Sequence, residues 1–203
     1  MALSNRIDQF EQHVRERCAD PNFLHHQWFA DWHLALVGRI ATELTAHYPA
    51  ADADMVRLLA WTHDYGKIID RENEHATTLV AAPPALRNVG FEQYTIDTLM
   101  DWMVLHDGHR QYDLTRAPIE VQIVSSADGC SHLTGPFMHI FWQEFAERPY
   151  EQLMESNRAK AQRDWCGKIV LPEARAAFRG RYDFVIEQAG MLPPNFIAPP
   201  QPQ

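Results

Sequence analysis

The chain has 203 residues, enough for one domain with a substantial hydrophobic core. Hydrophobic residues make up 46% of it and charged residues 22%, a balance that excludes extensive disorder. The formal net charge is -9 and no run is rich in Lys or Arg, which argues against a nucleic-acid polymer as partner. A small anionic ligand is still compatible with this charge, because a bound divalent cation reverses the field locally.

The cysteines and the apolar segments bear on the compartment. Cys18, Cys130 and Cys166 are too few and too scattered for a disulfide framework or a zinc knuckle, so we expect thiols in a reducing cytosol. The first residues carry charges throughout and lack the apolar core of a signal peptide. No uncharged apolar stretch is long enough to cross a bilayer. We therefore expect a cytoplasmic protein with no membrane partner.

Hydrophobic residues recur at spacings of three and four along nearly the whole chain, which indicates helices rather than strands. The pattern predicts an all-α fold with helices over residues 5–17, 23–47, 53–65, 73–82, 91–106, 118–132, 137–146, 150–166 and 173–189. Proline and glycine punctuate these segments, with breaks expected at Pro21, Pro49, Gly66, Pro83-Pro84, Gly108, Pro118, Gly135-Pro136, Pro149 and Pro172.

The last eleven residues, 193–203, are rich in proline, and we expect an extended tail there. This tail is either a frayed end or an arm that docks on the partner subunit of a homodimer. No internal repeat or low-complexity linker indicates a second domain, so residues 1–192 are predicted to form a single helical domain.

Histidine is over-represented, with eleven in the chain, and His33 falls on an apolar stripe. Phe29 precedes it by four residues and Val37 follows it by four, so a helix turns all three side chains toward the core. Taken alone, an inward histidine is explained as a hydrogen-bonded core residue. His33 becomes a candidate metal ligand only if other candidate ligands lie close to it in space.

The adjacent pair His63-Asp64, in VRLLAWTHDYGK, also points inward. Val56 and Leu59 precede His63 by seven and four residues, and Gly66 then ends the helix. A buried carboxylate beside an imidazole is costly unless something pairs with it, and a divalent cation is one such partner. A helix-end cap or a salt bridge is the alternative role for Asp64.

A second inward carboxylate, Asp128, lies in APIEVQIVSSADGCSHL. Val121 and Val124 precede it by seven and four residues, and small neighbours such as Gly129 allow another helix to approach closely. Together with the two imidazoles and the carboxylate above, Asp128 would complete a mixed nitrogen and oxygen ligand set. Such a set suits Mn, Fe, Co, Ni, Zn or Mg without choosing among them.

The ordered set of His33, His63-Asp64 and Asp128 resembles the ligand signature of the HD-domain superfamily of metal-dependent phosphohydrolases. His63 follows His33 by 30 residues, HDYGK is similar to the HDxGK of many members, and the helix around SSADG is similar to their last-ligand helix. The resemblance covers roughly residues 25–133. It implies an HD-domain-like helical bundle, with a core at about 23–133 whose ligands project into a central cleft and additional C-terminal helices at about 137–190.

Two further histidines resemble the extra ligands of superfamily members that bind two metals. His75 opens a helix soon after the HDYGK turn, and His106 follows apolar residues three, four and seven positions earlier. The resemblance implies a dinuclear centre bridged by Asp64, as in the cyclic-dinucleotide phosphodiesterases. That branch, however, carries two consecutive histidines where this chain has His106-Asp107, and its other signature residues are missing here. The chain departs from the branch at this point, so one metal and two both stay open.

Three more side chains are candidates for contact with a substrate. Lys67 follows the His-Asp turn and would balance charge or touch a phosphoryl oxygen, unless it is an ordinary surface lysine. His109 lies just past the helix of His106 and is either a ligand or acid in the cleft or a solvated loop residue. His132, four residues after Asp128, would orient a ligand or contact the substrate. We expect surface or packing roles for the remaining histidines, His13, His25, His26, His47 and His139.

The resemblance implies an enzyme that hydrolyses a small phosphate ester, a phosphomonoester or phosphodiester such as a nucleotide, with water activated by one or two divalent ions. Its partner would be a small anionic phosphorylated substrate, with specificity set by loops around residues 66–72, 83–90 and 107–117. Two alternatives stay open. One is a dinuclear-iron oxygenase of the same superfamily, and the other is a non-catalytic module that senses a nucleotide.

Overall fold

The computed structural model describes residues 3–108, 111–135, 137–194 and 196, and every regular element in these ranges is a helix. This confirms the predicted all-α fold. Within the same ranges, no helix combines the length and the apolarity that a membrane span requires.

Most helices begin and end within two residues of their predicted bounds. In chain order they are α1 (Leu3–Cys18), the π-helical turn η1 (Ala30–Leu34), α2 (Ala35–Thr45), α3 (Ala53–Thr62), the 3-10 turn η2 (Tyr65–Ile68), α4 (Glu74–Val89), α5 (Gln93–Asp107), the 3-10 turn η4 (Leu114–Arg116), α6 (Ile119–Ser131), α7 (Phe137–Glu144), α8 (Tyr150–Gly167) and α9 (Pro172–Gln188). Local signals explain several ends, because Asp52 caps α3 through the amides of Asp54 and Met55, and Pro172 occupies the first turn of α9.

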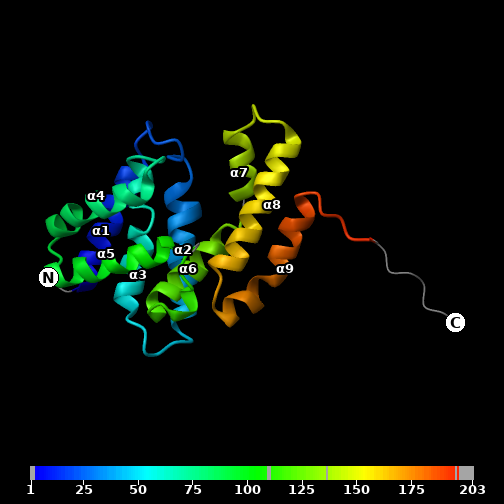
Figure 1. Cartoon of the computed structure of the whole chain (residues 1–203). Helices are drawn as coiled ribbons and strands as arrows, with labels where there is room; N and C mark the ends of the chain where they lie inside the picture. Colours follow the sequence, from blue (N-terminus) through cyan, green and yellow to red (C-terminus); the bar gives the residue numbers. More distant parts are fainter. Residues whose placement is uncertain (1–2, 109–110, 136, 195, 197–203) are drawn as a thin grey trace.

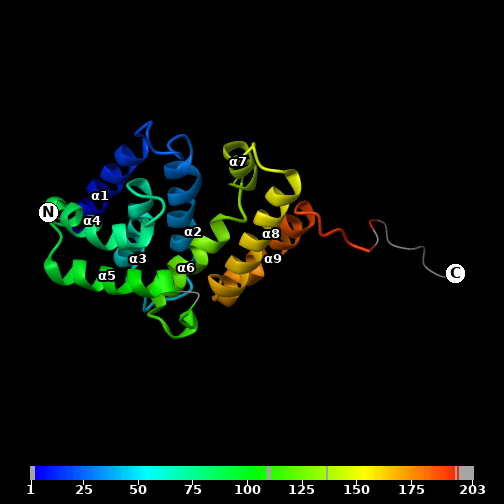
Figure 2. The same cartoon turned by 45° about the horizontal axis from the view of Figure 1, so that its top comes forward.

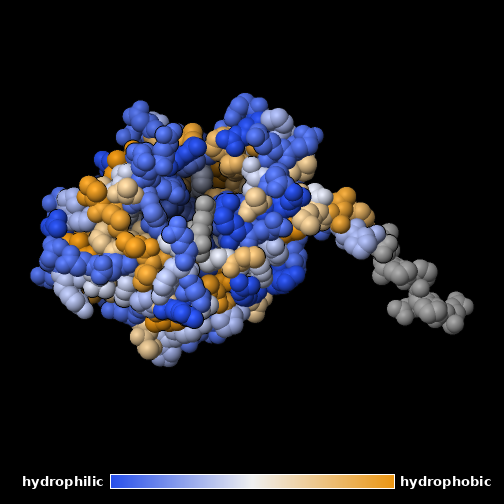
Figure 3. Space-filling view, in the orientation of Figure 1, coloured by the Kyte–Doolittle hydropathy of each residue, from blue (hydrophilic) through white to orange (hydrophobic). Residues whose placement is uncertain are grey.

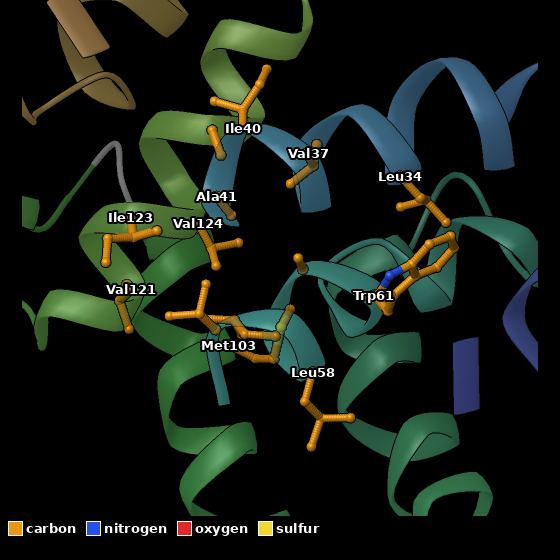
Figure 4. Packing of buried hydrophobic residues seen from close by; sticks show 14 of the residues in the cluster. Leu34, Val37, Ile40, Ala41, Leu58, Trp61, Met103, Val121, Ile123 and Val124 are labelled. Carbon is orange, nitrogen blue, oxygen red and sulfur yellow. The ribbon is translucent and has the colours of Figure 1, made fainter. Parts of the chain in front are cut away.

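The hydrophobic core forms where α2 and α6 cross α3 and α5. Figure 4 shows Val37 and Ala41 of α2 meeting Val124 of α6, with Met103 of α5 and Leu58 of α3 below them. These five side chains are at most 1% exposed. Burial on this scale stabilises each large side chain by about 1.5–3 kcal/mol, and it holds the helices that carry the candidate ligands in one relative position.

The C-terminal helices form a second group beside this core. In Figures 1 and 2, α7, α8 and α9 lie together on one side of α6, whereas α1, α4 and α5 lie on the other side. Ala161 of α8 and Ile169, just beyond α8, are fully buried against the core and attach the second group to α6. Helix α8 is thereby placed against the end of α6 that carries Asp128.

The predicted helix over 23–47 is wrong in its first part. Residues 23–28 form successive bends and turns, and helical structure begins only at Phe29, directly before η1. The physical reason is tertiary, because His25 and Trp28 both bind the carboxylate of Glu144 in α7 and Phe29 is buried in the core. These anchors hold the segment in a path that a continuous helix would not follow.

Two further predictions are corrected around α3 and α4. Helix α3 ends at Thr62, so His63 and Asp64 lie directly beyond it rather than within the predicted 53–65. Helix α4 runs through Pro83-Pro84, where a break and a specificity loop over 83–90 were expected. Two prolines remove two helical hydrogen bonds, but full burial of the flanking Ala82 and Leu86 against neighbouring helices offsets this loss.

Candidate metal centre

The structure brings the four main candidate ligands into one buried cluster. His33 lies in η1, His63 and Asp64 directly follow α3, and Asp128 lies in α6. Nε2 of His33 is 3.3 Å from Nε2 of His63 and 3.1 Å from Oδ2 of Asp64. Oδ1 of Asp128 is 3.7 Å from Nε2 of His33 and 3.8 Å from Nε2 of His63. The π-helical turn is a local irregularity of the kind that often marks functional sites, and it sets the direction of His33.

Hydrogen bonds on the outer side of both imidazoles decide which nitrogen is free. Nδ1 of His63 donates to the carbonyl of Ala60 at 2.8 Å. Nδ1 of His33 donates to the hydroxyl of Ser131 at 3.1 Å, because that hydroxyl already donates its own hydrogen to the Asp128 carbonyl. Burial lowers the pKa of both imidazoles and favours their neutral forms, in which each Nε2 presents only a lone pair.

The result is a group of three atoms that all accept hydrogen bonds. Nε2 of His33, Nε2 of His63 and Oδ2 of Asp64 lie 3.1, 3.3 and 3.6 Å from one another with no hydrogen between them. Three lone pairs at these distances repel one another, and the ammonium group of Lys67, 2.7 Å from Oδ2 of Asp64, offsets this repulsion only in part. The donor set and its outer hydrogen bonds match those of protein sites for divalent transition metals, so the residues fit a metal ion.

Of the two histidines proposed for a second metal, His106 joins this cluster. Its side chain is 2% exposed, and its Nδ1 lies 3.2 Å from a carboxylate oxygen of Asp107. Its Nε2 is buried without a hydrogen-bond partner among the described residues, and lies 3.9 Å from Oδ2 of Asp128. His75 is placed differently, because its half-exposed ring binds Asp107 through Nδ1. His109, the looser candidate, lies outside the described residues.

His132 belongs to the centre more directly than its sequence position indicated. Its ring stacks on His33 with centroids 5.1 Å apart, and its Nε2 is 3.5 Å from Oδ1 of Asp128. Its Nδ1 lies 2.9 Å from a carboxylate oxygen of Asp164, a buried residue of α8. Burial lowers the pKa of His132 to about 4, so the ring is neutral at pH 7, and Nδ1 donates to Asp164 while Nε2 faces Asp128.

Lysine side chains balance the buried carboxylates. Nζ of Lys67 is 2.7 Å from Oδ2 of Asp64, and Nζ of Lys168 contacts Oδ2 of Asp128. Burial alone would raise the pKa of both carboxyl groups, but the two ammonium groups outweigh it and hold both pKa values well below the ordinary value. Both carboxylates are therefore charged and available as ligands at neutral pH. Lys160, also from α8, lies 3.3 Å from Asp164.

Among the described residues, every side chain that lines the adjoining cavity of about 380 Å³ is ionisable, and we call this space the polar cavity. Its walls carry carboxylates, which include Asp64 and Asp128, the imidazoles of His75, His106 and His132, and the cations of Lys67, Lys160, Arg163 and Lys168. A larger cavity of about 530 Å³ lies among α7, α8 and α9 and shares only His132 with these walls. Of these two cavities, the one of about 380 Å³ has the candidate ligands Asp64 and Asp128 in its walls.

Sequence reasoning missed the contribution of α8. No motif was assigned to residues 137–190, yet Lys160, Arg163, Asp164 and Lys168 all line the polar cavity. One signal was present, because Lys160, Asp164 and Lys168 follow one another at spacings of four and so share one face of a helix. Nothing local shows that this face turns toward Asp128.

Comparisons of this chain with protein-family models, with curated proteins and with solved structures find no match.

Proposed function

We propose that this chain is a metal-dependent phosphohydrolase that acts on a small anionic phosphate ester. The observation that carries the proposal is the buried group of lone-pair acceptors from His33, His63 and Asp64, with Asp128 beside it. Such a group is stabilised by a divalent cation, and the adjoining cavity adds a wall of lysines suited to an anion. This combination supports hydrolysis at phosphorus more than chemistry on a neutral substrate.

Four side chains would hold the cation, namely His33, His63, Asp64 and Asp128. When bound, a divalent ion lowers the pKa of water and polarises a phosphoryl oxygen, which is the chemistry that phosphoester hydrolysis needs. If a second ion is held, His106 would be its ligand together with Asp128. Oδ1 of Asp128 faces His33 and His63, while its Oδ2 lies 3.9 Å from Nε2 of His106.

Other side chains of the cavity would bind and orient the substrate. Lys67 and Lys160 offer positive charge to the phosphoryl oxygens, which grow more negative as the leaving group departs. The Asp164 carboxylate fixes the ring of His132 through Nδ1, so Nε2 is held toward Asp128. In that position His132 would act either as a further ligand or as an acceptor for the proton of water at the site.

The experiment measures metal content and phosphoester hydrolysis on the same preparations. The native protein is analysed by inductively coupled plasma mass spectrometry and then screened against phosphomonoesters and phosphodiesters with added Mn, Fe, Co, Ni, Zn or Mg. His63→Ala and Asp64→Ala should lose the bound ion and the hydrolysis while their circular dichroism stays helical. His47→Ala changes an exposed histidine outside the centre and should retain both. Unchanged metal stoichiometry in both His63→Ala and Asp64→Ala would refute the proposal.

A dinuclear-iron oxygenase is the second candidate, because Nε2 of His106, which has no partner in the part of the chain that the structure describes, and the ring of His132 would add imidazole ligands around Asp128. Imidazole-rich ligation suits iron. Anaerobic purification followed by iron analysis and a test for oxygen consumption separates this candidate from the hydrolase. Two irons per chain with consumption of oxygen, and no hydrolysis of any ester, would favour the oxygenase.

A further inference from the structure

A third cavity, of about 280 Å³, adjoins the polar cavity and has a different character. Its walls include the rings of Trp28, Phe29, Phe137, Phe141 and Phe145, and we call it the aromatic pocket. It shares four lining residues with the polar cavity, so the two spaces are contiguous. Figure 3 shows this face of the molecule hollowed between the N-terminal helices and α7–α8, with hydrophobic surface inside the hollow.

Two of the shared residues, Lys67 and Lys160, lie at the boundary between the two cavities. Nζ of Lys67 is 2.7 Å from Asp64 on the metal side and 5.6 Å from the ring centroid of Phe29 on the aromatic side. Nζ of Lys160 is 3.3 Å from Asp164 and 5.5 Å from the ring centroid of Phe137. An anion bound between these two ammonium groups would therefore adjoin both the metal centre and the aromatic rings.

A partly buried carboxylate joins two walls of the pocket. Glu144 of α7 accepts hydrogen bonds from Trp28 Nε1 at 2.7 Å and from His25 Nδ1 at 2.9 Å. These bonds tie the irregular segment before η1 to α7, so the two walls that carry the rings are fixed relative to each other. The pocket carries charges of both signs, because Lys67, Arg71 and Lys160 line it together with Glu74 and Glu144.

We propose that the substrate is a phosphate ester that carries an aromatic group on a short linker, and that this group occupies the aromatic pocket. The inference rests on the proposed function for the identity of the anionic end. An apolar cavity of about 150 Å³ is known to hold one benzene ring, so a pocket of this volume has room for one or two rings. The surrounding aromatic side chains would supply stacked or edge-on contacts.

The experiment compares two phosphonates that cannot be hydrolysed, 2-phenylethylphosphonate and propylphosphonate. Both bind through the same anion, so the difference between their affinities isolates the aromatic group. Isothermal titration of the full-length, metal-loaded protein should show about tenfold tighter binding of the phenyl compound. Phe141→Ala should abolish most of this preference and leave the affinity for propylphosphonate within twofold. Phe184→Ala is the matched control, because Phe184 is 59% exposed on α9 and does not line the pocket, and it should retain the full preference.

The possible outcomes separate this inference from the proposed function. Equal affinity for the two phosphonates in the native protein would overturn the inference, even if the protein hydrolyses phosphate esters. A preference for the phenyl compound that Phe141→Ala removes supports the inference, even if no ester is hydrolysed. If Phe141→Ala fails to fold, Phe145→Ala tests the same wall from a partly exposed position. Equal weakening of both phosphonates by these variants also overturns the inference, because the aromatic ring would then have no contact of its own.

Discussion

Gly66, in the turn that follows His63-Asp64, is the position where one added methyl group should have the largest effect. A Cβ atom there would lie 2.0 Å from the carbonyl oxygen of Glu74, 2.4 Å from the amide nitrogen of Thr78 and 2.7 Å from its hydroxyl. The first two atoms belong to the backbone of α4, so no side-chain rotation relieves the contact. The amide of Gly66 also donates to the Thr78 hydroxyl at 2.8 Å, and this bond ties the turn to α4.

The size of the effect follows from these distances. Ordinary contacts begin at 3.4 Å, so the turn and α4 must separate by about 1.4 Å to remove the closest one. Overpacking of this kind costs about 1–3 kcal/mol. Loss of the hydrogen bond to Thr78 adds about 1 kcal/mol. We therefore expect Gly66→Ala to lower the free energy of unfolding by about 2–4 kcal/mol, which corresponds to a fall in Tm of roughly 4–16 °C for a chain of this size.

Thermal unfolding followed by circular dichroism checks this prediction. Gly38→Ala is the control, because Gly38 lies within α2 and its added Cβ would meet nothing closer than 3.7 Å. That variant should gain about 0.5–1 kcal/mol from the higher helix propensity of alanine. A Tm for Gly66→Ala within 1 °C of the native value would show that the turn does not pack on α4 as described. The described position of Lys67 beside Asp64, which depends on this turn, would then also be wrong.

Three further outcomes are expected. Removal of the metal by a chelator should lower the Tm by roughly 5–11 °C if the ion was present at 100 times its Kd. An unchanged Tm after the chelator is added would contradict a metal site in the folded protein. Asp164→Asn removes the carboxylate that orients His132, and it should weaken metal affinity about 10–100-fold in a chelator competition assay. A metal affinity within twofold of the native value would show that this carboxylate does not orient a ligand. Tyr48→Phe removes the hydroxyl that donates to Glu173 at 2.5 Å, a bond that depresses the pKa of Glu173 below its ordinary value of 4.5. A carboxyl group with a depressed pKa stabilises the fold above pH 4.5, and this contribution is lost as the pH falls through the folded-state pKa. The difference in Tm between Tyr48→Phe and the native protein should therefore shrink on acidification from pH 7. A difference in Tm that does not change with pH would contradict this origin.

The helices show how far local patterns reach. The predicted helix over 118–132 and the observed α6, Ile119–Ser131, differ by one residue at each end, because Pro118 and the apolar spacing act locally. The prediction failed at Pro83-Pro84, where the local signal for a break was strong. Burial of Ala82 and Leu86 against other helices outweighed that signal, and this burial depends on helices remote in the chain.

By itself, the sequence determined the all-α class and the inward direction of His33 and Asp128, because helical periodicity relates a side chain to apolar neighbours one or two turns away. Only the tertiary structure decided which inward groups share one centre. His132 meets Asp164 across 32 residues of sequence, and Lys160 reaches the same cavity from α8. Contacts of this kind depend on how whole helices pack, and the spacing of residues within one helix carries no information about that packing.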